Sequence, residues 1–212
     1  MIENRCIDDR QIQKGMAIDM GKYTIIADTG NCLVERLRGA LVPDLIQNAG
    51  EIGLRSPEDR GDTSLGLFLY DIRPSEEVYQ KRAVVTNDRV SRPPMFLSLS
   101  YMITAYSQGD IPYRLPQEER ILGRVIQYFY DNPIIPLEEV DPQGTGGTEL
   151  HIQMLKPDSD EKSRIWSFPN VGNRLSLFYR VSPVAINSEI SRKITRVTDL
   201  DINVSMNLGN GE

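Results

Sequence analysis

The chain has 212 residues, of which 40% are hydrophobic and 25% charged, as expected for a globular domain large enough to bury its own core. Its formal net charge of −6 argues against nucleic acid as the main partner, because phosphate binding needs a clustered excess of Lys and Arg. No apolar run approaches the ~20 residues that span a bilayer, so we expect no membrane insertion.

The first residues carry little structural pattern. Residues 1–21 are polar and lack a continuous apolar stretch, which argues against a secretory signal and predicts a polar N-terminal arm. Cys6 and Cys32 are the only cysteines, and two distant cysteines do not make a disulfide framework. These features favour a reduced, cytoplasmic place of assembly.

The first predicted helix covers Tyr23–Leu41 and ends before Pro43. Its apolar residues recur at three- and four-residue spacing, with charged residues between them. The recurring positions are Ile26, Gly30, Leu33, Val34, Leu37, Ala40 and Leu41. Asp44–Gly50 is predicted to be a turn or a short helical piece, and residues 52–54 a short strand.

Two longer strands are predicted at residues 64–72 and 95–107, because apolar residues alternate there with period two. The aligned positions on one face are Leu65, Leu67 and Leu69 in the first strand and Leu97, Leu99, Tyr101 and Ile103 in the second. The connection Arg73–Pro94 is long for a hairpin loop and rich in charge. We therefore expect an extended arm between the two strands.

The second helix is predicted to begin near Pro116, since proline suits the first turn. Glu118 and Glu119 then fall where the helix dipole favours anions. Its buried stripe comprises Ile121, Leu122, Val125, Ile126 and Phe129. The sequence Asn132-Pro133 ends the helix, because the residue before a proline disfavours helical geometry.

Three further elements follow. Alternating apolar residues predict a fourth strand at residues 150–154 and a fifth at residues 175–186. Between them, Asp158–Trp166 is predicted to be a short helix, with Asp158 and Glu161 at the spacing of a capping box. The order of elements predicts an α+β fold, with a mainly antiparallel sheet of about four to five strands and helices packed on one side.

The remaining residues form a polar tail. Ser188–Glu212 contains one alternating patch, at Ile202 and Val204, and fits either a solvated tail or a docking strand. Positive charge near this end comes from Arg180, Arg192, Lys193 and Arg196. It is either a solvated face or a docking surface for an acidic protein.

We expect the chain to have three parts: residues 1–21 as an arm, 22–188 as the domain and 189–212 as a tail.

The sequence offers no catalytic, cofactor or metal constellation. His151 is the only histidine, and its position predicts a surface side chain and not a member of a triad or a metal site. Gly144–Gly147 lacks the spacing and the Lys-Ser/Thr ending of a phosphate-binding loop. Trp166 is expected to be a core or interface anchor. The acidic residues Glu138, Glu139 and Asp141 are expected to form a solvated loop. We therefore expect no enzyme activity and no cofactor.

Several segments, in this order and spacing, resemble a known family. They are TIIADTGNCLVERLRGAL (24–41), SPEDRGDTSLGLFLYDIR (56–73), RPPMFLSLSYMITAYS (92–107), EERILGRVIQYFYDNPII (118–135) and IWSFPNVGNRLSLFYRVSPVAINS (165–188). Over residues 23–188 they are similar to the N-terminal domain of tail-terminator (cap) proteins of extracellular contractile injection systems, of the antifeeding-prophage and virulence-cassette type.

The resemblance implies a structural, non-enzymatic protein. It implies a homo-oligomer, a hexameric ring, on the distal end of the inner tube and sheath, where it stops polymerisation. It also implies a place in a released or intracellular injection particle. A closed ring joins two different edges of each protomer. We expect contacts from the charged connection 73–94 and the tail, and one from the fifth strand. The candidate contact residues are Arg73, Arg82, Arg89, Arg92, Arg180, Arg192, Lys193 and Arg196.

Two alternatives remain open at this point. A small α+β ligand-binding domain or enzyme predicts a defined pocket and a stable monomer. An assembly chaperone or adaptor of the same particle predicts another stoichiometry or a transient association.

Overall fold

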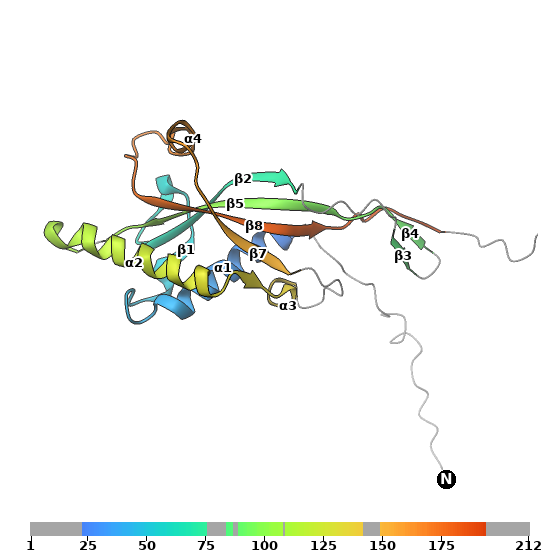
Figure 1. Ribbon diagram of the computed structural model, residues 1–212, viewed down its shortest axis with the longest axis horizontal. Coiled ribbons are helices and arrows are strands. Elements are labelled where there is room, and N and C mark those ends of the chain that lie inside the picture. The colour runs from blue at the N-terminus through green and yellow to red at the C-terminus, as the bar shows by residue number, and fades with distance from the viewer. Residues whose placement is uncertain (1–22, 76–83, 87–88, 108, 142–148, 194–212) are drawn as a thin grey trace, which may run out of the picture.

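The sheet at the centre of the molecule has six strands in the order β1-β2-β5-β8-β7-β6 (Figure 1). The computed structural model describes residues 23–75, 84–86, 89–107, 109–141 and 149–193. The strands are β1 (Ile52–Leu54), β2 (Leu65–Pro74), β5 (Met95–Ala105), β6 (Ile134–Ile135), β7 (Leu150–Leu155) and β8 (Ser176–Ile186). Only β1 and β2 pair in parallel, and the other neighbours are antiparallel.

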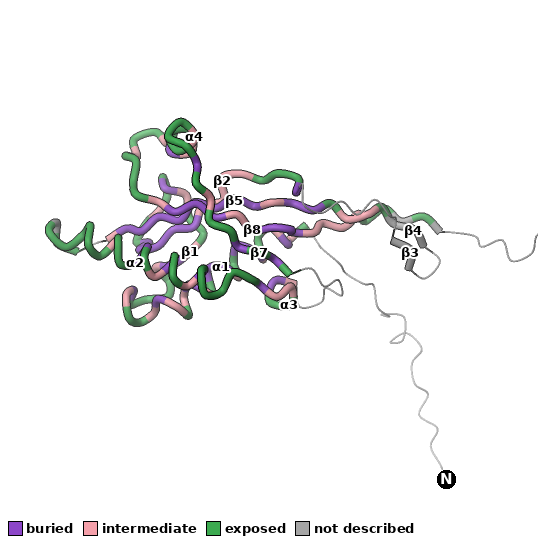
Figure 2. Tube along the Cα trace, viewed as in Figure 1, coloured by how far each residue is buried: buried purple, intermediate pink, exposed green. Residues whose placement is uncertain are grey.

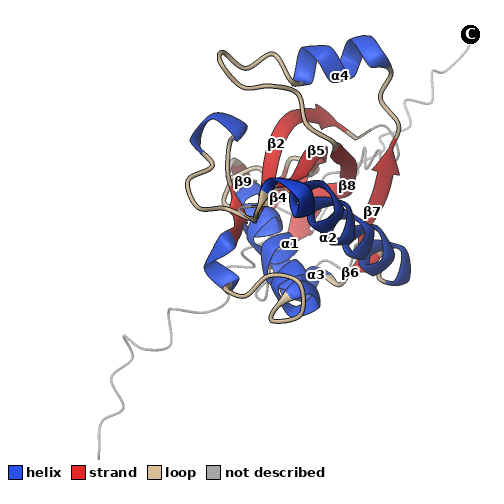
Figure 3. Cartoon of the chain, turned by 90° about the vertical axis from the view of Figure 1, so that its left-hand side faces the viewer, coloured by secondary structure: helices blue, strands red, loops and turns tan. Residues whose placement is uncertain are grey.

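Four helices lie on the two faces of this sheet. They are α1 (Ile25–Leu41), α2 (Ile111–Asp131), α3 (Leu137–Val140) and α4 (Ser159–Ile165). Figures 1 and 3 show α1, α2 and α3 on one face and α4 on the opposite face. Two short 3-10 turns, Ala49–Glu51 and Pro57–Asp59, flank β1.

The main core lies between the sheet and helices α1 and α2. The apolar stripes predicted for α1 and α2 form the helical side of this core. The buried residues that pack against β2, β5 and β8 are Leu33, Leu37, Leu122, Val125 and Phe129. The ring of Phe129 meets that of Tyr179 edge-on, with centroids 5.0 Å apart. Burial of this apolar area, at roughly 25 cal/mol per Å², is the main force that holds α1 and α2 on the sheet. Figure 2 shows this buried band along the middle strands.

A smaller core lies under α4 on the opposite face. Met102, Trp166 and Phe178 are buried there. Phe168 packs edge-on against both Trp166 and Phe68. Asp158 caps α4, because its Oδ1 accepts a 2.7 Å hydrogen bond from the Glu161 backbone N–H, as the capping-box spacing predicted.

Beyond the body, β5 and β8 lead to a second sheet of three short strands, which we call the arm (Figure 1). It consists of β3 (Val84–Thr86), β4 (Arg89–Ser91) and β9 (Ser191–Lys193), in the order β3-β4-β9. The long connection after β2 thus forms a hairpin, and residues of the predicted tail pair with it. Residues 1–22 and 194–212, which include most of the predicted terminal segments, lie outside the described residues.

The α+β class is confirmed, with some corrections. The sheet has one strand more than the predicted four to five, because β6 spans two residues and is too short to show a period. Helix α4 departs from the one-sided packing, since its apolar partners are Phe68, Met102 and Phe178 on the other face. Helix α2 starts at Ile111, five residues before Pro116, so the predicted start is wrong. Pro112 fills the first-turn position instead, and Pro116 lies inside the helix.

Candidate assembly surface

The basic residues expected to make contacts fall into four groups, the last of which lies in the arm. Arg73 and Arg92 are exposed where the body meets the arm, and Arg73 pairs with Asp71 at 2.5 Å. Arg180 lies half-buried in the middle of the sheet, in register with Ser100 on β5, so it belongs to the body. Arg82 and Arg196 lie outside the described residues.

The arm brings together three of the remaining basic residues. Arg89 on β4 stands directly opposite Lys193 on β9, and Arg192 stands opposite Val90. Like charges on paired cross-strand positions are unfavourable unless a counter-charge relieves them. The register of β4 and β9 therefore brings three basic positions together in the arm.

Helix α2 presents a second exposed surface that sequence reasoning missed. Its first half carries Tyr113 and Leu115 with 70% and 68% of their surface exposed. The carboxylate of Glu118 holds this half in place by accepting hydrogen bonds from the Ser107 backbone N–H at 2.9 Å and from Arg174 at 3.1 Å. The early proline at position 112 was the available signal that the helix began before Pro116.

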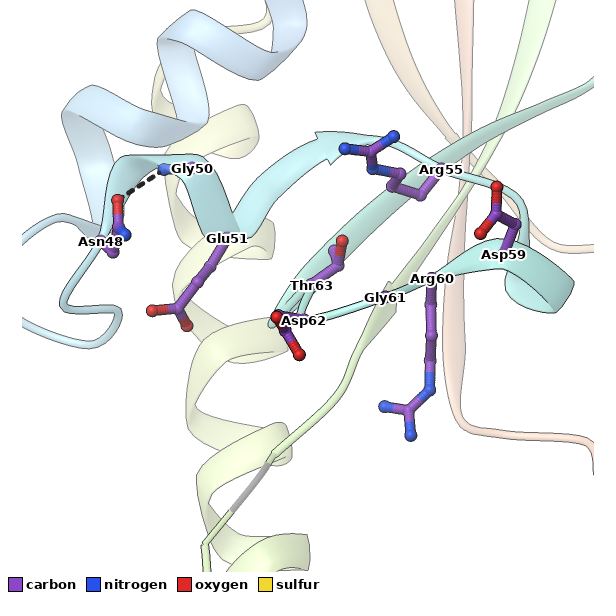
Figure 4. A pocket seen from close by; sticks show the side chains of 9 residues that line it. All are labelled: Asn48, Gly50, Glu51, Arg55, Asp59, Arg60, Gly61, Asp62 and Thr63. Carbon is purple, nitrogen blue, oxygen red and sulfur yellow. Dashed lines mark hydrogen bonds between the residues drawn. The ribbon is translucent and has the colours of Figure 1, made fainter.

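The loop after β1 surrounds an open, polar cavity of about 410 Å³ (Figure 4). Its lining residues are Asn48, Gly50, Glu51, Arg55, Asp59, Arg60, Gly61, Asp62 and Thr63. Asn48 Oδ1 accepts a 2.9 Å hydrogen bond from the Gly50 backbone N–H, and Gly61 takes the left-handed conformation that glycine tolerates. Acidic and basic side chains alternate around this cavity, and Glu51 in its wall accepts a hydrogen bond from the Ser64 hydroxyl.

Two arginines from distant segments cover one tyrosine ring at the edge of this loop. The guanidinium carbons of Arg60 and Arg174 lie 5.0 and 5.4 Å from the centroid of Tyr106. Burial raises the pKa of the Tyr106 hydroxyl above its ordinary value, more than the neighbouring positive charges lower it. These cation–π contacts fasten the loop and the segment before β8 to the end of β5.

The acidic segment predicted as a solvated loop is instead the helix α3. Glu139 accepts two hydrogen bonds from Arg36 of α1, at 2.8 and 2.9 Å, and so fastens α3 to α1. These hydrogen bonds lower the pKa of the Glu139 carboxyl and raise that of Arg36. Cys32 lies beside the pair, and burial raises the pKa of its thiol. The prediction failed because the ion pair joins residues far apart in sequence.

The other candidate chemical groups take structural positions. His151 is exposed on β7, opposite Ser182, and Trp166 is buried under α4. Within the described ranges, no group of three His, Cys, Asp or Glu side chains could hold a metal ion. None of the described helices is long and apolar enough to cross a bilayer. The glycine loop 144–147 lies outside the described residues.

Comparisons with known proteins agree on one family. A family model described as the Pvc16 N-terminal domain matches residues 28–199. The fold is similar to the sheath/tube terminator of the extracellular contractile injection system PVC, with a TM-score of 0.61 and 18% identity over 88% of this chain. It is also similar to the tube-terminating cap of the anti-feeding prophage, with a TM-score of 0.61 and 19% identity over 84%. The chain spans 65% and 61% of those two chains. No curated protein sequence matches it.

Proposed function

Because the chain belongs to the Pvc16 N-terminal domain family, we propose that it caps the tube and sheath of a contractile injection particle and ends their polymerisation. The observation that carries this proposal is the shared fold, which covers most of the chain in two solved terminators of such particles. The role is one of assembly and not of catalysis.

A closed ring of six copies is the form that we propose for this cap. Subunits on a symmetric tube end need two different, complementary edges to close head to tail. The molecule has such an asymmetry, since the arm lies at one end and the first half of α2 extends from the body at the other (Figure 1). The ring would assemble in the cytoplasm with the tube and sheath proteins.

Charge supports a role for the arm in this ring. Residues 73–94 hold five basic and three acidic residues, and residues 189–196 hold three basic and one acidic, so these two segments carry a net +4. The net charge of the whole chain is −6, so the residues outside these two segments carry a net charge of −10. A basic arm and an acidic body of the next copy attract one another. We therefore propose Arg73, Arg82, Arg89, Arg92, Arg192, Lys193 and Arg196 as contact residues, with Arg180 in a supporting position in the sheet.

The test is a capping assay. Purified chain is mixed with tube and sheath proteins of its own particle, and the length of the polymers is measured by negative-stain electron microscopy. A cap shortens the polymers in proportion to its concentration and shows as a ring at one end. Light scattering then gives the mass of the free protein, which is about six times 24.0 kDa for a preformed ring. Polymers of unchanged length with bare ends would refute the proposal. Shorter polymers without bound chain would favour a chaperone.

A further inference from the structure

The sheet has an uncovered edge beside a pocket near α4. Strand β6 pairs only with Leu150 and His151 at the start of β7, so no described strand covers the outer side of residues 153–155. The Ile152 N–H donates outward to the Pro133 carbonyl at 2.7 Å. Outward-facing groups alternate along an antiparallel strand, so the N–H and carbonyl of Met154 face the same edge.

The side chains around this edge are suited to an apolar strand with negative charges. Met154 is 51% exposed, although large apolar side chains are usually buried. A pocket of about 340 Å³ adjoins it and is lined by Leu155, Leu177 and Phe178, with Lys156 and Lys162 also in its wall. Both lysines are exposed, and neither forms an ion pair with another described residue. Figure 2 shows the exposed stretch that leads from β7 toward α4.

The two competing edges of the sheet are less accessible. At β1, the Arg38 guanidinium donates a 2.8 Å hydrogen bond to the Ile52 carbonyl, and the Ile52 N–H donates to the Ala49 carbonyl. Both backbone groups of Ile52 are therefore already paired. The outer part of β2 is interrupted by an irregularity after Leu69, carries the Asp71–Arg73 ion pair and ends in a proline. Irregularities, charges and prolines are features that prevent strands from adding to an edge.

One segment of this chain has the matching pattern. Residues 199–206, DLDINVSM, lie outside the described residues. Their apolar residues alternate at positions 200, 202, 204 and 206, and Asp199 and Asp201 stand between them. A strand of this pattern offers one apolar face and one edge of backbone groups, which is the requirement for β-augmentation. Its two carboxylates complement Lys156 and Lys162.

The start of the segment, with its two aspartates, cannot reach this edge within the same copy. Gln153 pairs with Arg180 on β8, and from there the chain runs along β8 and away from the body to Lys193 at the arm (Figure 1). That path covers on the order of 40 Å at the rise of an extended strand. Residues 194–199 return at most about 20 Å, even when fully extended. The occupant must therefore come from another copy.

We propose that residues 199–206 of one copy add a strand to the open edge of β7 in a second copy. The apolar side chains lie against Leu155 and Phe178 in the pocket beside α4, and the two aspartates pair with Lys156 and Lys162, which border that pocket. This contact rests on the proposed ring, in which each copy gives its segment to one neighbour and receives that of the other. It adds a strand exchange to the attraction between arm and body.

A peptide-binding experiment tests this contact without tube, sheath or ring. The host is the full chain with Leu200→Ser, Ile202→Ser and Val204→Ser, so that the segments of other host copies leave the site free. The probe is a fluorescent peptide of residues 197–208, and its anisotropy is measured. We expect saturable binding, at least tenfold weaker when the host also carries Lys156→Glu and Lys162→Glu. The exposed pair Arg55→Glu and Arg120→Glu makes the same charge change elsewhere and is expected to leave binding unchanged.

A charge exchange gives the second readout. A peptide with Asp199→Lys and Asp201→Lys is expected to bind the host with reversed lysines better than the original peptide does. Absence of saturable binding, or equal affinity for both hosts, would overturn the contact and leave the capping proposal intact. Binding by a chain that fails to cap would refute the capping function and keep the contact.

Discussion

The body and the arm of this molecule are stabilised by different forces. In the body, α1 and α2 bury a continuous apolar cluster against the sheet, and residues such as Leu37 are fully enclosed. The arm consists of three-residue strands joined by main-chain pairing, with Arg89 opposite Lys193. So small a sheet is marginal alone, and it persists here as a continuation of β5 and β8. Substitutions in the body should therefore change stability, and those in the arm should change association.

The largest effect on stability is expected from a cavity in the body. Leu37→Ala removes a fully buried side chain of α1 and should lower the free energy of unfolding by about 3 kcal/mol, within the usual range of 2–5 kcal/mol. Urea unfolding followed by the fluorescence of Trp166 measures it. A loss below about 1 kcal/mol would mean that α1 is not held mainly by apolar burial.

A smaller effect is expected at Gly30, where α1 lies close to β1 and β5. A Cβ on Gly30 would lie 3.0 and 3.2 Å from the methyl carbons of Leu54 and 3.4 Å from the Tyr101 hydroxyl. Gly30→Val should therefore cost about 1–3 kcal/mol through overpacking. Gly39 on the same helix has open space, so Gly39→Val is the matched control. Equal stability of the two variants would contradict this packing.

The link between α1 and α3 should contribute less than about 1 kcal/mol, because Glu139 is 45% exposed and its ion pair is screened. Its folded-state pKa is lowered, so its contribution is present above the ordinary value of 4.5 and is lost as pH falls through the folded-state pKa. Urea midpoints of wild type and Glu139→Gln should differ at pH 7 and converge in acid. A constant difference over the whole pH range would exclude the ionised pair as its cause.

The smallest effect on unfolding, within about 0.5 kcal/mol, is expected in the arm. Arg89→Glu combined with Lys193→Glu reverses the charge at two paired positions. The free energy of unfolding should be unchanged, while the mass of the ring and the capping of polymers decline. Light scattering and the capping assay measure the loss, and Leu37→Ala serves as the contrasting variant. A destabilisation as large as that of Leu37→Ala would show that the arm is part of the core.

The sequence predicted the body better than the arm, for a physical reason. The stripes of α1 and α2 and the alternation of β2, β5, β7 and β8 are local consequences of burial, and the structure confirms them with one exception. Ile126 was predicted in the buried stripe of α2, but it lies at the edge of that stripe and is 39% exposed. The family match confirms the resemblance carried by the same segments. Strands of two or three residues, such as β3, β4 and β6, are too short for a periodic signal and depend on their partners.

The candidate surface was predictable only in part. Positive charge in the two segments that build the arm can be counted from the sequence, but the pairing of Arg89 with Lys193 requires the register. The links Arg36–Glu139 and Arg60–Tyr106–Arg174 join residues far apart in the chain, which periodicity cannot reveal. The exposed Tyr113 and Leu115 lie before Pro116, the predicted start of the helix, and so outside the predicted element.

The two central strands have a mechanical consequence. β5 and β8 pair from Met95 opposite Ile186 to Thr104 opposite Ser176, and they continue toward the arm. Both strands leave the body at the same end, so a pull along the arm draws them in the same direction and loads in shear the hydrogen bonds that join them to β2 and β7. A ladder loaded in shear resists until many bonds give way together, whereas one opened from an end yields bond by bond. Tension on the arm is therefore carried directly into the buried core.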